Sequence, residues 1–308
     1  MIAFPARRTY IDPAMNGPET PWTVLSLLAW AGDHLADKGF DESRLHAELL
    51  LAHVLGVSRL DLYLQFDRPL IPDELGRFTT LFRRRLGREP LQYILGETEF
   101  MGCRLGVDRN VLIPRPETEQ LVEEALALAR RSAGARAEIL DVGTGSGNIA
   151  IALARLLPDA LITSIDVSPG ALAVARRNAE RNGTPNIIFE ESDLFGECLP
   201  GRSFTMIVAN PPYVTAEEYA GLQEEVRDFE PRIAVTDGGD GLRFIRRIAR
   251  LAAERLTPGG ALCMEIAWNQ GGSAAAIVGE AGLGNVLVKP DYAGHSRMVT
   301  AVRSGGGA

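Results

Sequence analysis

The sequence of 308 residues contains few cysteines, histidines and aromatic side chains, and each scarcity excludes a class of protein. Its three cysteines, Cys103, Cys198 and Cys263, lie far apart and form no CxxC pair. This spacing argues against a disulfide framework and against a zinc site. We therefore expect no bound metal, and a reducing cytoplasm as the compartment.

The chain also lacks long hydrophobic runs and an excess of positive charge. Charged residues interrupt every apolar stretch, and no apolar segment follows Arg7 and Arg8, so neither a membrane span nor a signal peptide is expected. The net charge of −8 disfavours a surface that coats nucleic acid, because neutralising phosphates requires clustered Lys and Arg. The densest basic cluster, Arg83 to Arg85 with Arg88, is interpreted as a solvated helix face.

Changes of pattern along the chain predict two domains. Residues 1–20 and 304–308 show no periodicity and are expected to be disordered. Within residues 21–89, apolar residues recur at helical spacings, which predicts a small helical bundle with Gly56 as a helix C-cap. Residues 90–115 interleave apolar residues with glycines, which predicts a linker that contains a β-hairpin.

Strands and helices then alternate from residue 116 to residue 303. Repeated βαβ units predict an α/β fold with a largely parallel, doubly wound sheet. The last two strands are joined by a loop too short for a crossover helix, and they are predicted to be antiparallel. Helices are expected at 148–157 and from Ser168, as N-cap, to Asn182; a turn is expected at 257–260; strands are expected at 139–141, 160–165, 187–189, 204–209, 261–266, 286–288 and 298–302.

A glycine-rich loop follows the first of these strands. The third glycine of a dinucleotide-binding loop would fall on Asn148, so that motif is not met. The pattern D-x-G-x-G-x-G is met instead. It suits a loop whose amides face a carboxylate while an acidic residue takes an ammonium group, and its residues are Asp141, Gly143, Thr144, Gly145, Ser146 and Gly147.

Three residues after the next two strands extend this site. Asp166 ends the second strand, where a carboxylate can accept hydrogen bonds from both hydroxyls of a ribose. Asp193 is placed to bind an adenine amino group, and Phe195 could cover the adenine ring. Judged alone, Asp193 and Phe195 could each equally well be a plain loop or core residue. Together with the glycine loop, they predict S-adenosylmethionine as the methyl donor.

The fourth strand ends in the tetrapeptide Asn210-Pro211-Pro212-Tyr213, which could equally be a surface turn when taken alone. The two prolines make the turn rigid. Beside a methyl donor, the Asn210 side-chain oxygen and the Pro211 carbonyl can accept both N–H bonds of a planar nitrogen, and Tyr213 can stack on it. Such a reaction needs no strong general base, and the four histidines are interpreted as surface or packing residues.

With these motifs, the chain resembles the HemK-like family of glutamine N(5)-methyltransferases, most closely its peptide chain release factor branch. The resemblance extends over residues 22–303 and is carried by the stretches 47–56, 90–96, 112–119, 141–148, 210–213 and 240–242. The stretch from Leu112 to Glu119 is the more specific signal, because amino-nucleobase methyltransferases share the tetrapeptide but not this stretch. Residues before Pro21 have no counterpart in the family.

The resemblance implies a helical N-terminal domain that helps to bind the release factor, a hairpin linker, and a Rossmann-like class I methyltransferase domain. The implied substrate is the glutamine of the Gly-Gly-Gln loop of class I release factors. Residues 143–147, Asp166, Phe195 and Asn210 would bind the donor, and residues 210–213 the glutamine. Some relatives carry Trp at position 195, so Phe195 keeps the stacking face and loses an N–H donor.

Other functions remain open from the sequence. The nearest is the ribosomal-protein glutamine branch of the same family, and residues 115–119 favour release factors over it. A nucleic-acid amino-group methyltransferase should carry a basic surface and aromatic platforms, whereas this chain is acidic with 6% aromatic residues. A donor-sensing adaptor without catalysis is disfavoured by the intact tetrapeptide. We expect a monomer with no nucleic-acid specificity and no membrane partner.

Overall fold

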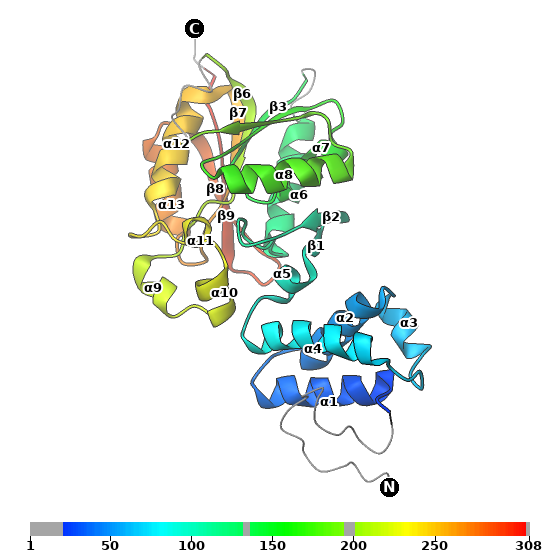
Figure 1. Cartoon of the computed structure of the whole chain (residues 1–308). Coiled ribbons are helices and arrows are strands. Elements are labelled where there is room, and N and C mark those ends of the chain that lie inside the picture. Colours follow the sequence, from blue (N-terminus) through cyan, green and yellow to red (C-terminus); the bar gives the residue numbers. More distant parts are fainter. Residues whose placement is uncertain (1–20, 132–135, 194–200, 306–308) are drawn as a thin grey trace. The chain divides into compact units, whose positions relative to one another are not determined.

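The structure, a computed structural model, describes residues 21–131, 136–193 and 201–305, and the chain divides into two compact units between Leu95 and Gly96 (Figure 1). The predicted disorder of residues 1–20 and the predicted role of Phe195 lie outside the described residues. No helix in the described ranges is both long and apolar enough to cross a lipid bilayer.

The first unit is a small bundle of helices. Thr23 caps the first helix through a reciprocal pair of hydrogen bonds with Ser26. Gly56 ends the second in the left-handed conformation, at φ 67°, as predicted. The core that holds the helices together includes Leu27, Leu50 and Phe78. The helices are α1 (Val24–Asp37), α2 (Ser43–Leu55), α3 (Arg59–Tyr63), α4 (Pro72–Leu86) and α5 (Leu91–Leu95).

The basic cluster at the end of α4 is partly structural. Arg84 forms an ion pair with Glu89 at 2.8 Å. Arg85 is only 5% exposed, and its guanidinium carbon lies 4.2 Å from the centre of the Phe40 ring. The interpretation of the cluster as a solvated helix face is therefore wrong for Arg85, whose charge is buried against an aromatic ring and the Glu89 carbonyl.

The second unit begins with the predicted hairpin, β1 (Glu97–Phe100) and β2 (Cys103–Gly106), which pair antiparallel. Helix α6 (Glu117–Arg131) leads into a seven-stranded sheet of order β5-β4-β3-β6-β7-β9-β8. Its strands are β3 (Glu138–Val142), β4 (Leu161–Asp166), β5 (Ile187–Glu191), β6 (Phe204–Ala209), β7 (Leu256–Glu265), β8 (Gly284–Pro290) and β9 (Ser296–Val302). The remaining long helices are α7 (Asn148–Leu156), α8 (Pro169–Asn182), α12 (Arg243–Arg255) and α13 (Gly271–Glu280).

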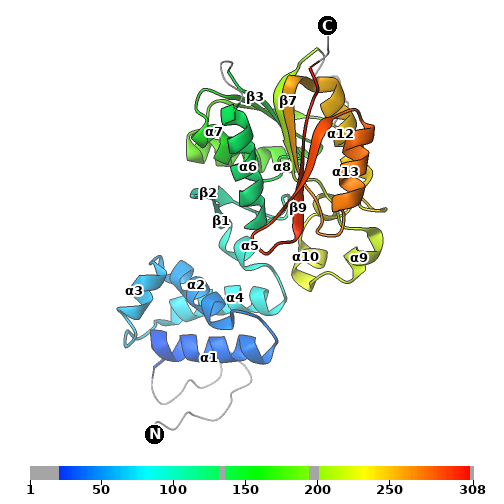
Figure 2. The ribbon, with the colours of Figure 1, turned by 180° about the vertical axis from the view of Figure 1, so that it is seen from behind.

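Helices cover both faces of the sheet. The strands from β5 to β7 are parallel, and β9 runs antiparallel to both β7 and β8, as predicted. Helices α6, α7 and α8 lie on one face, and α12 and α13 lie on the other (Figure 1, Figure 2). Neighbouring residues of one strand therefore enter different cores: Ile139 packs with α6 and α7, and Leu140 packs with α12 and α13. The predicted doubly wound α/β fold is confirmed.

The turn predicted at residues 257–260 is instead part of β7. Phe204 pairs with Leu256, but Met206 pairs with Ala261, so four residues of β7 bulge out opposite Thr205. A Cβ on Gly260 would lie 2.9–3.1 Å from three carbonyl oxygens, so a glycine is needed where the bulge returns to the ladder. Ser168 caps α8 by accepting a hydrogen bond from the Ala171 N–H, as predicted.

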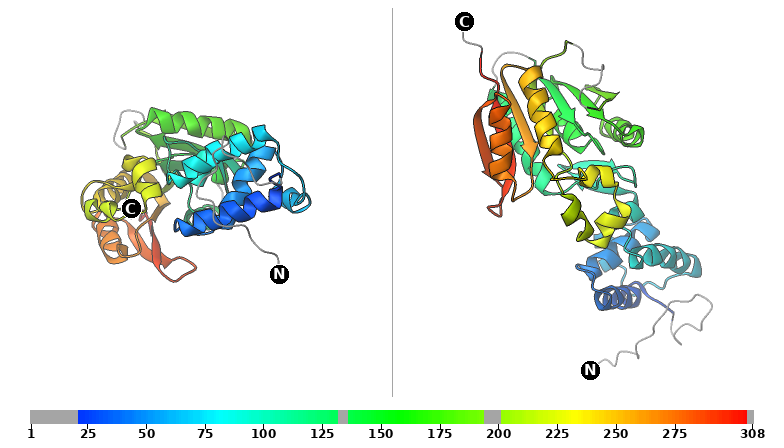
Figure 3. Two further views of the ribbon diagram at one scale, coloured as in Figure 1. Left: turned by 60° about the horizontal axis from the view of Figure 1, so that its bottom comes forward. Right: turned by 90° about the vertical axis from the view of Figure 1, so that its left-hand side faces the viewer.

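A segment of three short helices, which the sequence patterns did not predict, separates β6 from α12 and lies beyond one end of the sheet (Figure 1, Figure 3). Its two ends are tied together, because Val214 N donates to Val235 O and Ala216 N donates to Gly239 O. At its exit, a Cβ on Gly241 would overlap the Tyr213 carbonyl oxygen. The helices are α9 (Ala216–Ala220), α10 (Glu224–Phe229) and α11 (Arg232–Val235).

This close approach predicts that Gly241→Ala destabilises the second unit more than Gly238→Ala. Both glycines have positive φ, +74° and +72°, but a Cβ on Gly238 would meet no atom within 4 Å. Gly238→Ala should cost roughly 1–2 kcal/mol for the left-handed conformation alone. Gly241→Ala should cost about 1–3 kcal/mol more from overlap. Urea unfolding of both full-length variants measures the difference, and equal losses would contradict the packing role of Gly241.

Candidate active site

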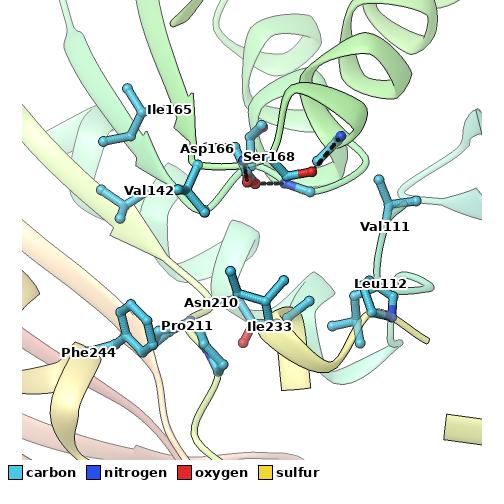
Figure 4. Close-up of a pocket in the computed structure, with 18 of the residues that line it drawn as sticks. Val111, Leu112, Val142, Ile165, Asp166, Ser168, Asn210, Pro211, Ile233 and Phe244 are labelled. Atoms are coloured by element: carbon cyan, nitrogen blue, oxygen red, sulfur yellow. Dashed lines mark hydrogen bonds between the residues drawn. The ribbon is translucent and has the colours of Figure 1, made fainter. Parts of the chain in front are cut away.

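A cavity of about 370 Å³ lies beyond the carboxyl ends of the central strands. Strands β3 and β6 are neighbours, although the chain builds β4 and β5 on one side of β3 before it returns to form β6 on the other. Such a switch point is where open α/β sheets bind ligands. Figure 4 shows Val142, Ile165 and Asp166 on one side of this cavity, facing Asn210 and Ile233.

Most of the site residues predicted from the sequence meet at this cavity. Those that line it are Gly143, Thr144, Gly145, Ser146, Asp166, Asp193, Asn210, Pro211 and Pro212. Asp141, Gly147 and Tyr213 are not among the lining residues. The structure therefore brings together the loop after β3, the end of β4 and the turn after β6, which are far apart in the sequence.

Glycine is needed at the three positions of the loop for different structural reasons. Gly143 and Gly145 have φ of +75° and +52°, and a Cβ on either would meet no atom within 4 Å. Their backbone borders open space that a ligand can occupy. A Cβ on Gly147 would lie 3.2 Å from the Ala175 Cβ and 3.1 Å from the Ile151 side chain. Gly147 is thus required where α7 packs against α8, rather than at the cavity wall.

Asp166 joins the glycine loop to α8. Its Oδ2 accepts a hydrogen bond from Gly145 N, and its Oδ1 accepts one from Ser168 N, both at 2.9 Å. Burial raises the pKa of Asp166 above its ordinary value, against the effect of these backbone donors. Each carboxylate oxygen keeps capacity for a further donor, so Asp166 can bind hydroxyl groups in the cavity while it holds the loop.

Asp141 lies behind the loop and is fully buried. Its Oδ2 accepts a hydrogen bond from Ser164 Oγ at 2.6 Å, whereas Oδ1 has no hydrogen-bond partner among the described residues. Burial raises the pKa of Asp141 to about 6, although the hydroxyls of Ser164 and Thr144 oppose this shift. A buried carboxylate oxygen without a donor is costly, and it favours a positively charged group nearby.

Asp193 lines the cavity just beyond the end of β5. Its backbone oxygen and its Oδ1 both accept hydrogen bonds from Arg247 Nη2, at 2.8 Å. The Asp193 side chain is 71% exposed, so it remains open to another polar group. Arg247 also lines the cavity, with Phe244 beside it.

Asn210 belongs to a chain of hydrogen bonds that joins it to Thr118, which also lines the cavity, and then to Glu265 behind the cavity wall. Its Nδ2 donates to Thr118 Oγ1 at 3.1 Å, and Thr118 Oγ1 donates to Glu265 Oε2 at 2.8 Å. The Tyr213 hydroxyl donates to the other oxygen, Glu265 Oε1, at 3.2 Å. Tyr213 thus directs its hydroxyl to Glu265 and not into the cavity. Burial raises the pKa of Glu265 to about 7.

Sequence reasoning did not assign roles to Thr118 and Glu265. Thr118 lies in the stretch 112–119, which was recognised as specific for the family without a role for each residue. Glu265 is an acidic residue at the end of the apolar strand expected at 261–266. That position was the one available signal, because a carboxylate in a buried strand requires hydrogen-bond donors.

Another buried carboxylate, that of Glu230, joins two walls of the cavity. Arg115 Nη2 forms an ion pair with Glu230 Oε1 at 2.5 Å, and Ile113 N donates to Glu230 Oε2 at 3.2 Å. Burial raises the pKa of Glu230, and Arg115 acts in the opposite direction. The segment before α6 is therefore fixed to the residues just before α11, and Arg115 and Ile233 both line the cavity.

Comparison with known proteins relates about 90% of the chain to one family. The family model of the PrmC N-terminal domain matches residues 26–96, and that of the methyltransferase small domain matches residues 120–226. The chain is 45% identical to the release factor glutamine methyltransferase of Geobacter sulfurreducens, over 90% of this chain and 96% of that protein. It is 44% identical to the protein of the same name from Chlorobaculum tepidum, over 89% and 95% of the two chains. The chain thus belongs to the family of release factor glutamine methyltransferases, as the sequence resemblance predicted.

Proposed function

We propose that the protein methylates the side-chain amide nitrogen of the glutamine in the Gly-Gly-Gln loop of class I peptide chain release factors. The observation that carries this proposal is the position of the Asn210 amide. It lies on the cavity wall at the end of β6, facing Asp166 (Figure 4), in a chain that is similar to release factor glutamine methyltransferases over 90% of its length. The methyl donor proposed for this reaction is S-adenosylmethionine.

The residues around the cavity fit this donor. The open backbone at Gly143 and Gly145 leaves room beside the loop amides, and the unpartnered Asp141 Oδ1 supplies negative charge behind the loop for an ammonium group. Asp166 is proposed to accept hydrogen bonds from the ribose hydroxyls, and Asp193 and Phe195 to bind the adenine. When bound, S-adenosylmethionine supplies an electrophilic methyl group on a sulfonium ion.

The acceptor half of the site would activate a poor nucleophile by orienting it. An amide nitrogen delocalises its lone pair, so it reacts only when the lone pair is turned toward the methyl group. Asn210 Oδ1 and the Pro211 carbonyl are proposed to accept its two N–H bonds, which fixes that direction and stabilises the developing positive charge. The rigid Pro211-Pro212 turn maintains the geometry. Stacking of the Tyr213 ring on the amide stays a prediction.

The first unit is proposed to hold the release factor. This part of the proposal is supported by the family model of the PrmC N-terminal domain, which matches residues 26–96. The domain limits of 21–89, 90–115 and 116–303, the monomeric state, the lack of nucleic-acid specificity and the cytoplasmic location stay predictions.

The proposed function is tested by incubating the protein with methyl-labelled S-adenosylmethionine and, in parallel, a class I release factor, a ribosomal protein and DNA. We expect label only on the release factor, at the glutamine of its Gly-Gly-Gln loop. A release factor with that glutamine replaced by glutamate is the control and should remain unlabelled. Label on the ribosomal protein alone would indicate the other glutamine branch, and label on DNA alone an amino-nucleobase enzyme.

Asn210→Ala should abolish methyl transfer, because it removes the acceptor that orients the substrate nitrogen. Among the described residues, Asn210 forms one side-chain hydrogen bond, to Thr118, so the change should leave folding nearly intact. The affinity for the donor should change little, because the glycine loop and Asp166 are proposed to make most of its contacts. Turnover of the release factor measures the first effect, and calorimetric titration with S-adenosylmethionine the second. Near-normal turnover by this variant would contradict the proposed mechanism.

Asp166→Ala should weaken the binding of S-adenosylmethionine by roughly 1.5–3 kcal/mol, the range for lost hydrogen bonds to a charged group. Asp159→Ala provides a matched control, because Asp159 is exposed in the turn that precedes the other end of β4. Calorimetric titration of both variants measures the binding free energy. Unchanged affinity in Asp166→Ala would remove Asp166 from the ribose site.

A further inference from the structure

We infer that Thr118 and Glu265 are positioning residues that turn the Asn210 amide so that its oxygen, and not its nitrogen, faces the substrate. This inference rests on the proposed function, in which Asn210 Oδ1 accepts an N–H bond of the glutamine amide. The three residues are far apart in the sequence. Thr118 lies 92 residues before Asn210, and Glu265 lies 147 residues after Thr118.

The direction of the hydrogen bonds follows from the charge of Glu265. An ionised carboxylate only accepts hydrogen bonds. Thr118 has a single hydroxyl proton, and this proton is donated to Glu265 Oε2 at 2.8 Å. Thr118 can therefore offer only a lone pair to Asn210. A lone pair requires a donor, so the group 3.1 Å from Thr118 Oγ1 is the Asn210 Nδ2, as observed.

The opposite orientation of the Asn210 amide would make two contacts unfavourable, one with Thr118 and one with the substrate. The side-chain amide has nearly the same shape after a half-turn, so packing alone does not select one orientation. After that half-turn, Asn210 Oδ1 would face the lone pair of Thr118. The Asn210 Nδ2 would then face a substrate amide nitrogen that also donates. The carboxylate thus converts a symmetric side chain into a directed hydrogen-bond acceptor.

Charged groups on several elements act on Glu265. Its strongest perturbation is burial, which raises its pKa to about 7, while Thr118, Arg297 on β9 and the Tyr213 hydroxyl lower it. Glu117, in the first turn of α6, raises it further. Tyr213 and Cys263 remain protonated, because burial raises the pKa of each well above neutrality. Glu265 is therefore the group in this network that titrates near neutral pH.

Protonation of Glu265 should remove the directing effect. A protonated carboxyl can donate to Thr118 Oγ1, which frees the Thr118 proton to bind Asn210 Oδ1. Both amide orientations then become acceptable to the network. The neutral form dominates below the pKa, so methyl transfer should reach its full rate only well above pH 7 and should fall as the pH drops through about 7.

Three variants separate positioning from packing. Thr118→Val keeps the shape of the side chain but removes the hydroxyl, and it should lower kcat on the order of 10- to 100-fold. The affinity for S-adenosylmethionine should not change. Thr118→Ser keeps the hydroxyl and should restore most of the rate. The matched control is Thr300→Val, on β9, where the threonine is 5% exposed and lies outside this network; it should turn over normally.

The pH profile supplies a readout that a packing defect would not change. At saturating donor, wild-type kcat should show an acidic limb near pH 7. Glu265→Gln should lack this limb, because an amide does not titrate in this pH range. Working at saturating donor separates this limb from any titration of Asp141 or Asp166 that acts on donor binding.

These measurements distinguish failure of the inference from failure of the proposed function. If wild type labels the release factor and Thr118→Val retains its kcat, the positioning role is wrong and the function stands. If wild type labels no release factor, the function fails. In that case nuclear magnetic resonance tests the hydrogen bond between Asn210 and Thr118. Thr118→Val should shift the resonances of the Asn210 side-chain NH₂ group. Unchanged resonances would overturn the inference in that case.

Discussion

Buried carboxylates at the carboxyl edge of the sheet impose the main constraint on this site, because each must receive hydrogen-bond donors or a positive charge. Glu230 receives Ile113 N and the Arg115 guanidinium. Glu265 receives the hydroxyls of Thr118 and Tyr213. Since these donors come from other parts of the chain, satisfying the carboxylates fixes three parts of the site against one another. These are the turn at residues 210–213, the segment before α6 and the three-helix segment.

The stretch from Leu112 to Glu119 shows how one short sequence can serve several of these ties. Its first part binds Glu230 through Ile113 and Arg115, and Thr118 connects Asn210 to Glu265. Glu119 accepts a hydrogen bond from Met101 N in the hairpin at 2.8 Å. A substitution in this stretch therefore disturbs the cavity from several sides at once, which gives a physical reason for its specificity as a sequence signal.

The parts of the site that sequence analysis predicted are those whose chemistry is local. The glycine loop, Asp166 and the Asn210 turn each follow directly from a strand, and the carboxyl ends of parallel strands meet at one edge. Tyr213 and Gly147 follow the same rule, yet the structure directs the first to Glu265 and uses the second to pack α7 on α8. Thr118 and Glu265 were missed because their partnership joins residues 147 positions apart.

The orientation of Asn210 matters most in the proposed reaction. There, the reactive face of a planar nitrogen is selected by dipoles that are held in place before the substrate arrives. Hydrogen-bond acceptors are suited to this task only when they point in one direction. An asparagine side chain has no such preference by itself. Its direction must come from a neighbouring group, and the buried Glu265, when it is ionised, provides that direction through Thr118.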